Sequence, residues 1–287
     1  MNASSAPNPS LSPEQVRQFH EQGFLVIPGF YDLAEDIAPI QKGIHQIIGQ
    51  VLKRHGLPDT RGPFQPATFD EGYQALIAAN RAHGGEVYDA IKQIPAFLRL
   101  LGTPAHEALF AQLRADAIPA IAAGGYGIRV DNPGEERFRA PWHQEYPAQL
   151  RSLDGLVYWS PLVPVTPELG PVRLCIGSHH DGPVPVHTRD PRNPDKTGAY
   201  GLILKDEEAL VAGYEQVAPL SNPGDLVIID FLTLHASGRN QGQRSRWSMQ
   251  FRYFNFNDPT GMKHGWKGSY AAGVDFATVH PELCLDA

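Results

Sequence analysis

The pattern of apolar residues changes near residue 120, and this change constrains the fold more than any other feature of the chain. Beyond it, short apolar or alternating runs stand between Gly, Pro, Asn and Asp residues, with no helical pattern between them. Strands without intervening helices cannot form a parallel βαβ sheet, so we expect an antiparallel sandwich or barrel. The runs are YGIRV, DGLVYWSPLV, PVRLCIG, AYGLILK, DLVIIDFLTLH and SRWSMQFRYFNF.

The part of the chain before this change has helical character. Ser12 and Gln15 stand at the two positions of a capping box, which predicts a helix over Pro13–Gln22. Isoleucines then recur at helical spacing between residues 34 and 56, which indicates an amphipathic helix. The first part of the chain is therefore expected to be mainly α.

A further helical region spans residues 69–115, and Gly84–Gly85 and Pro95 are expected to interrupt it, because Gly and Pro punctuate helical patterns. Together the two parts predict an α+β protein with a mainly β core. From these parts we expect an antiparallel sandwich or barrel with the N-terminal helices packed on the outside. The resemblance of four segments to a known family, given below, implies the more specific architecture of a double-stranded β-helix, that is, a cupin-like jelly roll.

A chain of 287 residues can bury one large core, so we expect a single domain. Residues 1–10 are rich in Pro, Ser and Asn and are expected to be disordered. The domain then covers residues 11–287. Within it we expect a helical portion at about 11–115, a jelly-roll portion at about 120–257 and a C-terminal tail at 258–287.

Composition excludes several kinds of function. The formal net charge of -7 argues against nucleic acid as the main partner, because binding phosphates requires a basic field, so a small molecule is expected. The start of the chain lacks signal-peptide features and no run of about 18 apolar residues occurs, so we expect a cytoplasmic protein without a membrane partner. Cys175 and Cys284, the only cysteines, provide no disulfide framework. Any metal site must use His, Asp or Glu.

The stretch PWHQEY places an imidazole and a carboxylate two residues apart. On a β-strand His143 and Glu145 point to the same side, while Gln144 points to the other. The pair is therefore either two ligands of one metal ion or two polar side chains on the solvent-exposed face of a strand.

His235 is the best candidate for a third ligand. It ends the apolar run GDLVIIDFLTLH, which predicts a buried imidazole that must be hydrogen-bonded or coordinated. A core histidine bonded to a backbone carbonyl remains the alternative. Arg246 follows in the next expected strand, where its guanidinium can offer a planar fork to a carboxylate.

Four segments, in order along the chain, resemble the phytanoyl-CoA dioxygenase family of Fe(II)/2-oxoglutarate oxygenases. WHQE is similar to the family's W-H-x-[DE] metal pair, and each other segment is similar to the family at the corresponding place. The segments are LSPEQVRQFHEQGFLVIPGF, WHQE, LVYWSPLVPVTPELGPVRLCIGSH and PGDLVIIDFLTLHASGRNQGQRSR.

The resemblance implies that His143, Glu145 and His235 bind Fe(II), leaving positions for 2-oxoglutarate and O₂. The family usually has Asp where this chain has Glu145. Relatives that halogenate have a small residue in place of the carboxylate, so the resemblance implies hydroxylation of a C–H bond, with release of succinate and CO₂.

The resemblance further implies that Arg246 pairs with the distal carboxylate of 2-oxoglutarate, with Ser237 beside it and Trp159 against the cosubstrate. Each of the last two has a structural alternative, a loop cap for Ser237 and an ordinary core aromatic for Trp159. Arg244 is the local rival of Arg246, since both share one face of a strand by parity.

Substrate binding is the least determined part. Arg129, Arg139 and His179 are candidate substrate contacts, and the arginines suggest an anionic small molecule. The alternative is that these arginines form surface ion pairs with nearby Asp and Glu residues. The sequence determines neither the substrate nor the oligomeric state.

Two other functions compete with an oxygenase. A catalytically silent jelly roll that binds a metal or ligand needs no Arg246, so the complete residue set counts against it. A hydrolase built on Ser178, with His179 or His180 as the base and Asp181, fails on geometry, because adjacent residues in one turn cannot easily align a nucleophile, a base and its orienting carboxylate.

Overall fold

The computed structural model describes residues 9–190, 202–268 and 275–285. Most of the start that we expected to be disordered, residues 1–10, lies outside these described residues. None of the helices in the described ranges combines the length and the apolar character needed to cross a lipid bilayer.

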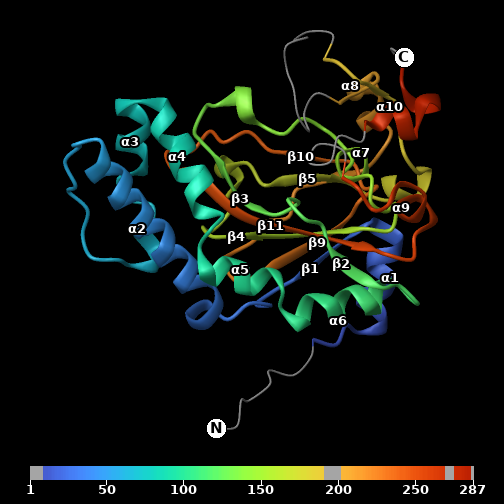
Figure 1. Cartoon of the computed structure of the whole chain (residues 1–287), viewed down its shortest axis with the longest axis horizontal. Helices are drawn as coiled ribbons and strands as arrows, with labels where there is room; N and C mark the ends of the chain where they lie inside the picture. Colours follow the sequence, from blue (N-terminus) through green and yellow to red (C-terminus); the bar gives the residue numbers. More distant parts are fainter. Residues whose placement is uncertain (1–8, 191–201, 269–274, 286–287) are drawn as a thin grey trace.

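Figure 1 shows the arrangement of the helices and strands. The α-helices are α1 (Pro13–Gln22), α2 (Ala38–Arg54), α3 (Tyr73–Ala79), α4 (Arg81–Ile91), α5 (Pro95–Leu101), α6 (Pro104–Leu113), α7 (Tyr146–Gln149), α8 (Glu207–Ala212), α9 (Pro259–His264) and α10 (Phe276–Val279). The strands are β1 (Phe24–Ile27), β2 (Pro119–Ile121), β3 (Gly127–Asp131), β4 (Leu156–Pro161), β5 (Val172–Cys175), β6 (Val186–His187), β7 (Ile203–Leu204), β8 (Gln216–Val217), β9 (Leu226–Asp230), β10 (His235–Ser237) and β11 (Arg246–Asn255).

The strands form two main sheets. The larger has the order β1-β9-β4-β11-β2, with β3 also paired to β11, and the smaller has the order β10-β5-β8. All neighbouring strands in the described part of the chain pair antiparallel, which confirms the expectation from the sequence. Helices α2 to α6 gather on one side of the larger sheet (Figure 1). The helical portion also contributes β1 to that sheet.

The first helix forms as its sequence predicts. Ser12 Oγ accepts a hydrogen bond from the Gln15 amide, and the Gln15 side chain accepts one from the Ser12 amide. Gly23 ends the helix in the left-handed conformation at φ 81°, a conformation that glycine adopts at little cost. The chain then turns directly into β1, which packs against β9.

Strand β4 is buried on both faces, and its alternating residues belong to two cores. Leu156 and Tyr158 pack with the helices, whereas Val157 and Trp159 pack in the space between the two sheets. Because successive side chains on a strand point in opposite directions, the molecule has three layers. These are the helices, the larger sheet and the smaller sheet.

The expected break at Gly84–Gly85 is wrong, because α4 runs through both glycines. Helices α3 and α4 separate at Asn80 instead, where the side chain accepts a hydrogen bond from the Ala82 amide (2.9 Å). Each glycine costs a helix about 1 kcal/mol relative to Ala. Tertiary packing of α4 against α2 and α3, with Val87 fully buried, outweighs this cost.

The expectation that His235 ends one long strand is also wrong. β9 ends at Asp230, and His235 begins β10, which belongs to the smaller sheet. Between them the Thr233 amide donates to the Asp230 carbonyl (3.0 Å), and the Leu232 amide donates to the Asp230 side chain (2.7 Å). The turn carries the chain from one sheet to the other, so a single apolar run contributes to both.

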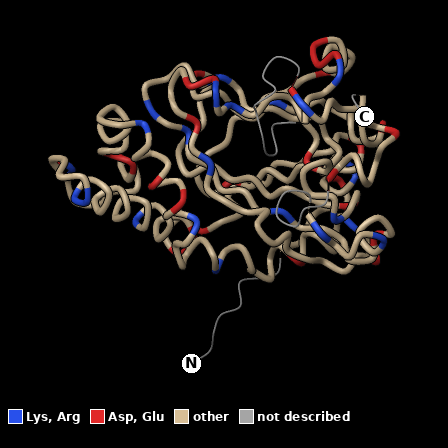
Figure 2. Tube along the Cα trace, turned by 45° about the horizontal axis from the view of Figure 1, so that its top comes forward, with Lys and Arg blue, Asp and Glu red and all other residues tan. Residues whose placement is uncertain are grey.

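Acidic and basic residues are interspersed along the described chain (Figure 2). Arg114, which follows α6, contacts both Asp154 and Asp230. The guanidinium therefore ties the helical layer to the larger sheet through two carboxylates.

His106 is a fully buried titratable group in α6. Its Nε2 lies 2.7 Å from Tyr31 Oη, and its ring stacks on Tyr158 with the centroids 4.7 Å apart. Burial lowers the pKa of the imidazole to about 3. The folded protein therefore keeps this side chain neutral at pH values at which the unfolded chain already binds a proton.

We expect His106 to reduce the free energy of unfolding by about 1 kcal/mol when the pH falls from about 7.5 to about 5.5, because only the unfolded state protonates an imidazole in this range. Urea denaturation at both pH values measures the effect. The variant His106→Gln, which does not titrate, should have a pH dependence smaller by this amount. Equal pH dependence in the two proteins contradicts the prediction.

Candidate metal centre

The structure brings His143, Glu145 and His235 together in the space between the two sheets. Their potential ligand atoms all lie within 4.8 Å of one another. The two imidazole centroids are 4.2 Å apart, and Glu145 Oε2 is 3.9 Å from His235 Nε2. Nitrogen and oxygen ligands bind a divalent transition metal at about 2.0–2.2 Å, so small side-chain rotations suffice to place all three on one ion.

Backbone hydrogen bonds position the three residues. The amides of His143 and His235 each donate to the other's carbonyl at 3.0 Å, which forms an isolated antiparallel bridge. The Glu145 amide then donates to the Phe231 carbonyl (2.9 Å), and the chain turns into α7. From the sequence we considered His143 and Glu145 as residues of one β-strand. In the structure they do not lie on a regular strand. They converge because a bridge is followed at once by a helical turn.

Both imidazoles are oriented by the same kind of hydrogen bond, between Nδ1 and the backbone carbonyl of the residue two positions earlier. His143 Nδ1 lies 2.8 Å from the Pro141 carbonyl, and His235 Nδ1 lies 2.9 Å from the Thr233 carbonyl. A carbonyl accepts only, so Nδ1 carries the proton and Nε2 carries the lone pair that binds a metal. Burial lowers the pKa of both imidazoles, that of His143 to about 3, which keeps the neutral, ligating form.

Arg252 and Gln149 hold the carboxylate of Glu145. Arg252 Nε and Gln149 Nε2 both donate to Oε1, at 2.6 Å and 3.2 Å, while Arg252 Nη2 lies 3.1 Å from Oε2. Burial alone raises the pKa of this carboxyl, but the guanidinium outweighs it and lowers the pKa to about 2. Glu145 is therefore ionised, with Oε2 directed toward His235.

Arg252 was missed in the sequence, although a signal was present. Residues 246, 248, 250 and 252 share one face of β11, so the parity that turns Arg246 inward also turns Arg252 inward. The side chains of Arg246, Gln250 and Arg252 all line the cavity at the metal centre.

Arg246 is 1 % exposed and lies in the same cavity. Its Nη2 donates to Asp131 Oδ2 (2.7 Å) and to Ser237 Oγ (3.0 Å). Its Nε and Nη1 have no hydrogen-bond partner in the structure. A buried donor without a partner costs about 1–3 kcal/mol, so this guanidinium is poised to bind a planar carboxylate. Trp159, as expected, also lines this cavity.

The choice between Arg244 and Arg246 depends on where β11 begins. Arg246 is the first residue of the strand, so Arg244 lies outside it and escapes the parity rule. Arg244 instead pairs with Asp70, with Nη2 at 2.7 Å from Oδ1, and does not line the metal-centre cavity. The structure therefore places Arg246, and not Arg244, next to the candidate ligands.

The three candidate substrate residues occupy different places. Arg129 lines the cavity and pairs with Asp131 (2.9 Å). Arg139 pairs with Glu136 (2.7 Å) and donates to the Ser237 carbonyl, just outside the cavity lining. These two ion pairs favour the ion-pair alternative over a substrate carboxylate.

His179 lies away from the metal centre. Its Nε2 is 3.0 Å from the His20 carbonyl at the end of α1, and it is absent from the cavity lining. Its role in substrate binding stays a prediction.

A second group of potential ligands occurs between α2 and α4, at His55, His83 and Glu86. The two rings stack at 3.8 Å with an interplanar angle of 20°. Glu86 lies 2.8 Å from His55 and 3.5 Å from Arg54. None of the three lines the cavity at the first group.

Two imidazoles and one carboxylate around a common point are the facial triad of non-haem iron oxygenases. The family model described as phytanoyl-CoA dioxygenase (PhyH) matches residues 19–248. The chain therefore belongs to the phytanoyl-CoA dioxygenase family, as the resemblance of its motifs implied.

Individual relatives are distant but cover most of the chain. "Phytanoyl-CoA dioxygenase domain-containing protein 1" of Mus musculus is 24% identical over 265 residues, which are 82% of this chain and 87% of that protein. The Rattus norvegicus protein of the same name is 25% identical over 270 residues, 84% of this chain and 89% of that protein.

Solved structures share the fold. EctD from S. alaskensis, solved with 2-oxoglutarate and 5-hydroxyectoine, has a TM-score of 0.57 at 19% identity, over 95% of this chain and 90% of that chain. The non-heme alpha ketoglutarate dependent carbocyclase SnoK from nogalamycin biosynthesis has a TM-score of 0.53 at 20% identity, over 85% and 84%.

We expect Arg252→Met to weaken metal binding about 10- to 100-fold, because Glu145 loses the charged donor that orients it. Arg252→Lys, which retains the charge but not the fork, should lie between this variant and the wild type. Anaerobic calorimetric titration with Fe(II) measures the affinities. Unchanged affinity in Arg252→Met, with the fold retained by circular dichroism, contradicts the assignment.

Proposed function

We propose that the chain is an Fe(II)/2-oxoglutarate-dependent dioxygenase that hydroxylates an unactivated C–H bond of a small molecule and releases succinate and CO₂. Family membership supports the oxygenase class. The observation that carries the proposal is the buried guanidinium of Arg246, with two unpartnered donors, in the same cavity as the His-Glu-His group.

In this proposal the iron is held by His143 Nε2, Glu145 and His235 Nε2. Bound iron supplies the site at which 2-oxoglutarate and O₂ meet. The donor set fits this metal, since it offers two neutral imidazoles and one ionised carboxylate in a buried space. The backbone bridge and the two Nδ1 hydrogen bonds fix the imidazoles before any metal binds.

Arg246 is assigned to the distal carboxylate of 2-oxoglutarate, with Ser237 and Trp159 beside it. Asp131 and Ser237 hold the guanidinium through Nη2, and its Nε and Nη1 donors have no partner among the described residues. This anchoring lowers the entropy cost of binding, because the guanidinium is oriented in advance. Trp159, 4 % exposed, supplies an apolar wall.

Hydroxylation is the proposed outcome because Glu145 occupies the carboxylate position. An ionised carboxylate clamped by Arg252 takes the place that a halide needs in a halogenating site. The two antiparallel sheets facing each other across the candidate site support a double-stranded β-helix as the detailed topology. The cytoplasm remains the proposed location.

The competing function, a catalytically silent binding protein, needs the ligands but not the anchored arginine. Asp131 is fully buried and shared between Arg129 and Arg246, an arrangement costly to maintain without a ligand to bind. This network favours an enzyme.

Anaerobic addition of Fe(II) and 2-oxoglutarate should produce a visible metal-to-ligand charge-transfer band. Glu145→Ala should lose the band and 2-oxoglutarate turnover, because it removes a proposed ligand and the carboxylate that pairs with Arg252. Succinate formation measures turnover. A well-folded, iron-loaded wild type without the band would instead favour the silent binding protein.

Arg246→Lys should raise the KM for 2-oxoglutarate on the order of 10- to 100-fold, because an ammonium cannot replace the bidentate fork. Arg244→Lys is the matched control, two residues away and paired with Asp70 outside the cavity, and it should leave the KM unchanged. Succinate formation against 2-oxoglutarate concentration gives both values. A larger effect in Arg244→Lys reverses the assignment.

A further inference from the structure

A second cavity adjoins the metal centre, between α4, β3 and the loop that follows β3. Its volume is about 290 Å³, whereas the metal-centre cavity has about 30 Å³. Arg129 lines both cavities. The lining residues are Tyr73, Arg81, Gly84, Gly85, Tyr88, Arg129, Val130 and Phe138.

The presence of glycine at two consecutive positions of α4 has a different physical explanation at each position. A Cβ on Gly84 would lie 2.8 Å from Ile77, 2.9 Å from Arg81 and 3.0 Å from Tyr73, so close packing requires this glycine. A Cβ on Gly85 would meet nothing within 4 Å. Packing therefore does not explain Gly85, although it weakens the helix. Because Gly85 has no side chain, the space in front of it at the cavity wall stays open.

Aromatic surfaces dominate the other walls. Tyr88 and Phe138 are 42% and 47% exposed, large values for apolar rings on a folded protein. The Arg81 guanidinium lies 5.0 Å from the centroid of Phe138, and Glu135 neutralises it through two hydrogen bonds. Aromatic faces bind flat rings by stacking, with ring centroids about 4.5–7 Å apart.

Arg81 and Arg129, the charged residues that line this cavity, are each paired with a carboxylate, while Lys92 lies 3.8 Å from the Tyr88 ring centroid and Arg137 lies 5.3 Å from that of Phe138. Arg81 pairs with Glu135, and Arg129 pairs with Asp131 and donates to the Phe138 carbonyl (2.6 Å). The walls therefore present aromatic faces and paired charges, a surface suited to a neutral ring. About 290 Å³ accommodates one or two fused rings.

We propose that this cavity binds a flat, neutral ring system of the primary substrate, and that Gly85 sets the size of ring it admits. The interpretation of this cavity as a substrate pocket rests on the proposed oxygenase function. Ring binding itself is measurable without turnover.

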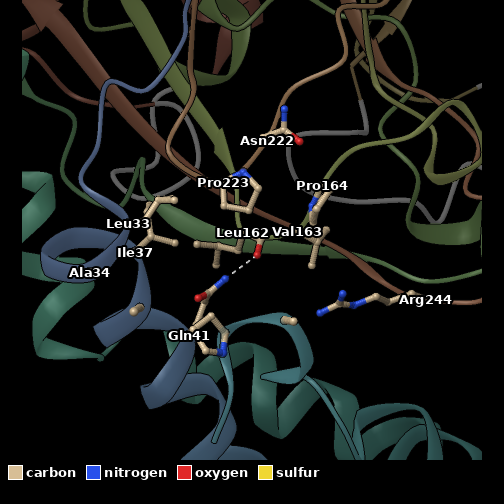
Figure 3. A pocket seen from close by; sticks show the side chains of 13 residues that line it. Leu33, Ala34, Ile37, Gln41, Leu162, Val163, Pro164, Asn222, Pro223 and Arg244 are labelled. Atoms are coloured by element: carbon tan, nitrogen blue, oxygen red, sulfur yellow. Dashed lines mark hydrogen bonds between the residues drawn. The ribbon is translucent and has the colours of Figure 1, made fainter.

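A larger cavity, of about 540 Å³, is the rival site. Figure 3 shows it between the start of α2 and the segments around Leu162 and Pro223, with Arg244 at one side. Gln41 Nε2 donates to the Leu162 carbonyl (2.8 Å) within it. It shares no lining residue with the metal-centre cavity.

The test uses 2-naphthol, a neutral fused-ring probe, and determines its dissociation constant for the full chain by saturation-transfer NMR titration. Gly85→Leu should weaken binding on the order of tenfold or more, because its side chain enters the ring's volume, while Gly85→Ala should bind nearly as the wild type does. Both variants should keep or raise the thermal midpoint, since each replaces a helix glycine. Tyr88→Ala removes a stacking wall and should also weaken binding.

Ala34→Leu, which fills the rival cavity, is the matched control and should leave 2-naphthol binding unchanged. Loss of binding in Ala34→Leu with none in Gly85→Leu overturns the proposal, as does the absence of saturable binding to the wild type. The charge-transfer band with Fe(II) and 2-oxoglutarate is recorded for each variant. Its retention in Gly85→Leu separates loss of the ring pocket from failure of the oxygenase assignment.

Discussion

The candidate site depends on the pair of backbone hydrogen bonds that joins His143 to His235. These two amide-to-carbonyl contacts, both 3.0 Å, connect the segment after β3 to β10 of the smaller sheet. The two imidazoles belong to segments far apart in the chain, and these hydrogen bonds bring the segments together. With them, the Nε2 atoms face one point, and the next turn delivers Glu145 to the same point. Backbone geometry, rather than side-chain attraction, assembles the ligands.

At the candidate site, each of the two buried carboxylates is paired with arginine. Glu145 is clamped by Arg252, and Asp131 lies between Arg129 and Arg246. Removing one partner of such a pair typically costs about 3–5 kcal/mol, because the remaining charge is left unpaired in a poorly solvated space. The network is thus rigid, and its two unpartnered donors on Arg246 are a fixed feature of the cavity. The same pairing joins Asp131 to Arg129, which also lines the neighbouring cavity.

The helical layer does more than cover the larger sheet. α4 closes one side of the ring cavity, and its contacts with α2 and α3 keep the Gly84–Gly85 step helical. Local preference alone predicts a break there, since two glycines weaken a helix. Packing overrode that preference at Gly84 and left Gly85 facing open space. Gly85 lowers helix stability and no packing contact requires it, so we relate this glycine to the cavity that it faces.

The sequence by itself determined the first helix with its capping box, the antiparallel strands and the candidate ligands His143, Glu145 and His235. These follow from local hydrogen bonding, from the period of a strand and from the motifs of a family. The tertiary structure decided that Arg246 rather than Arg244 faces the ligands, and that Arg252 holds Glu145. Parity fixes which side chains share a face within one strand. It does not fix where a strand begins, how a turn crosses between sheets or which helix closes a cavity, because those depend on contacts between residues far apart in the chain.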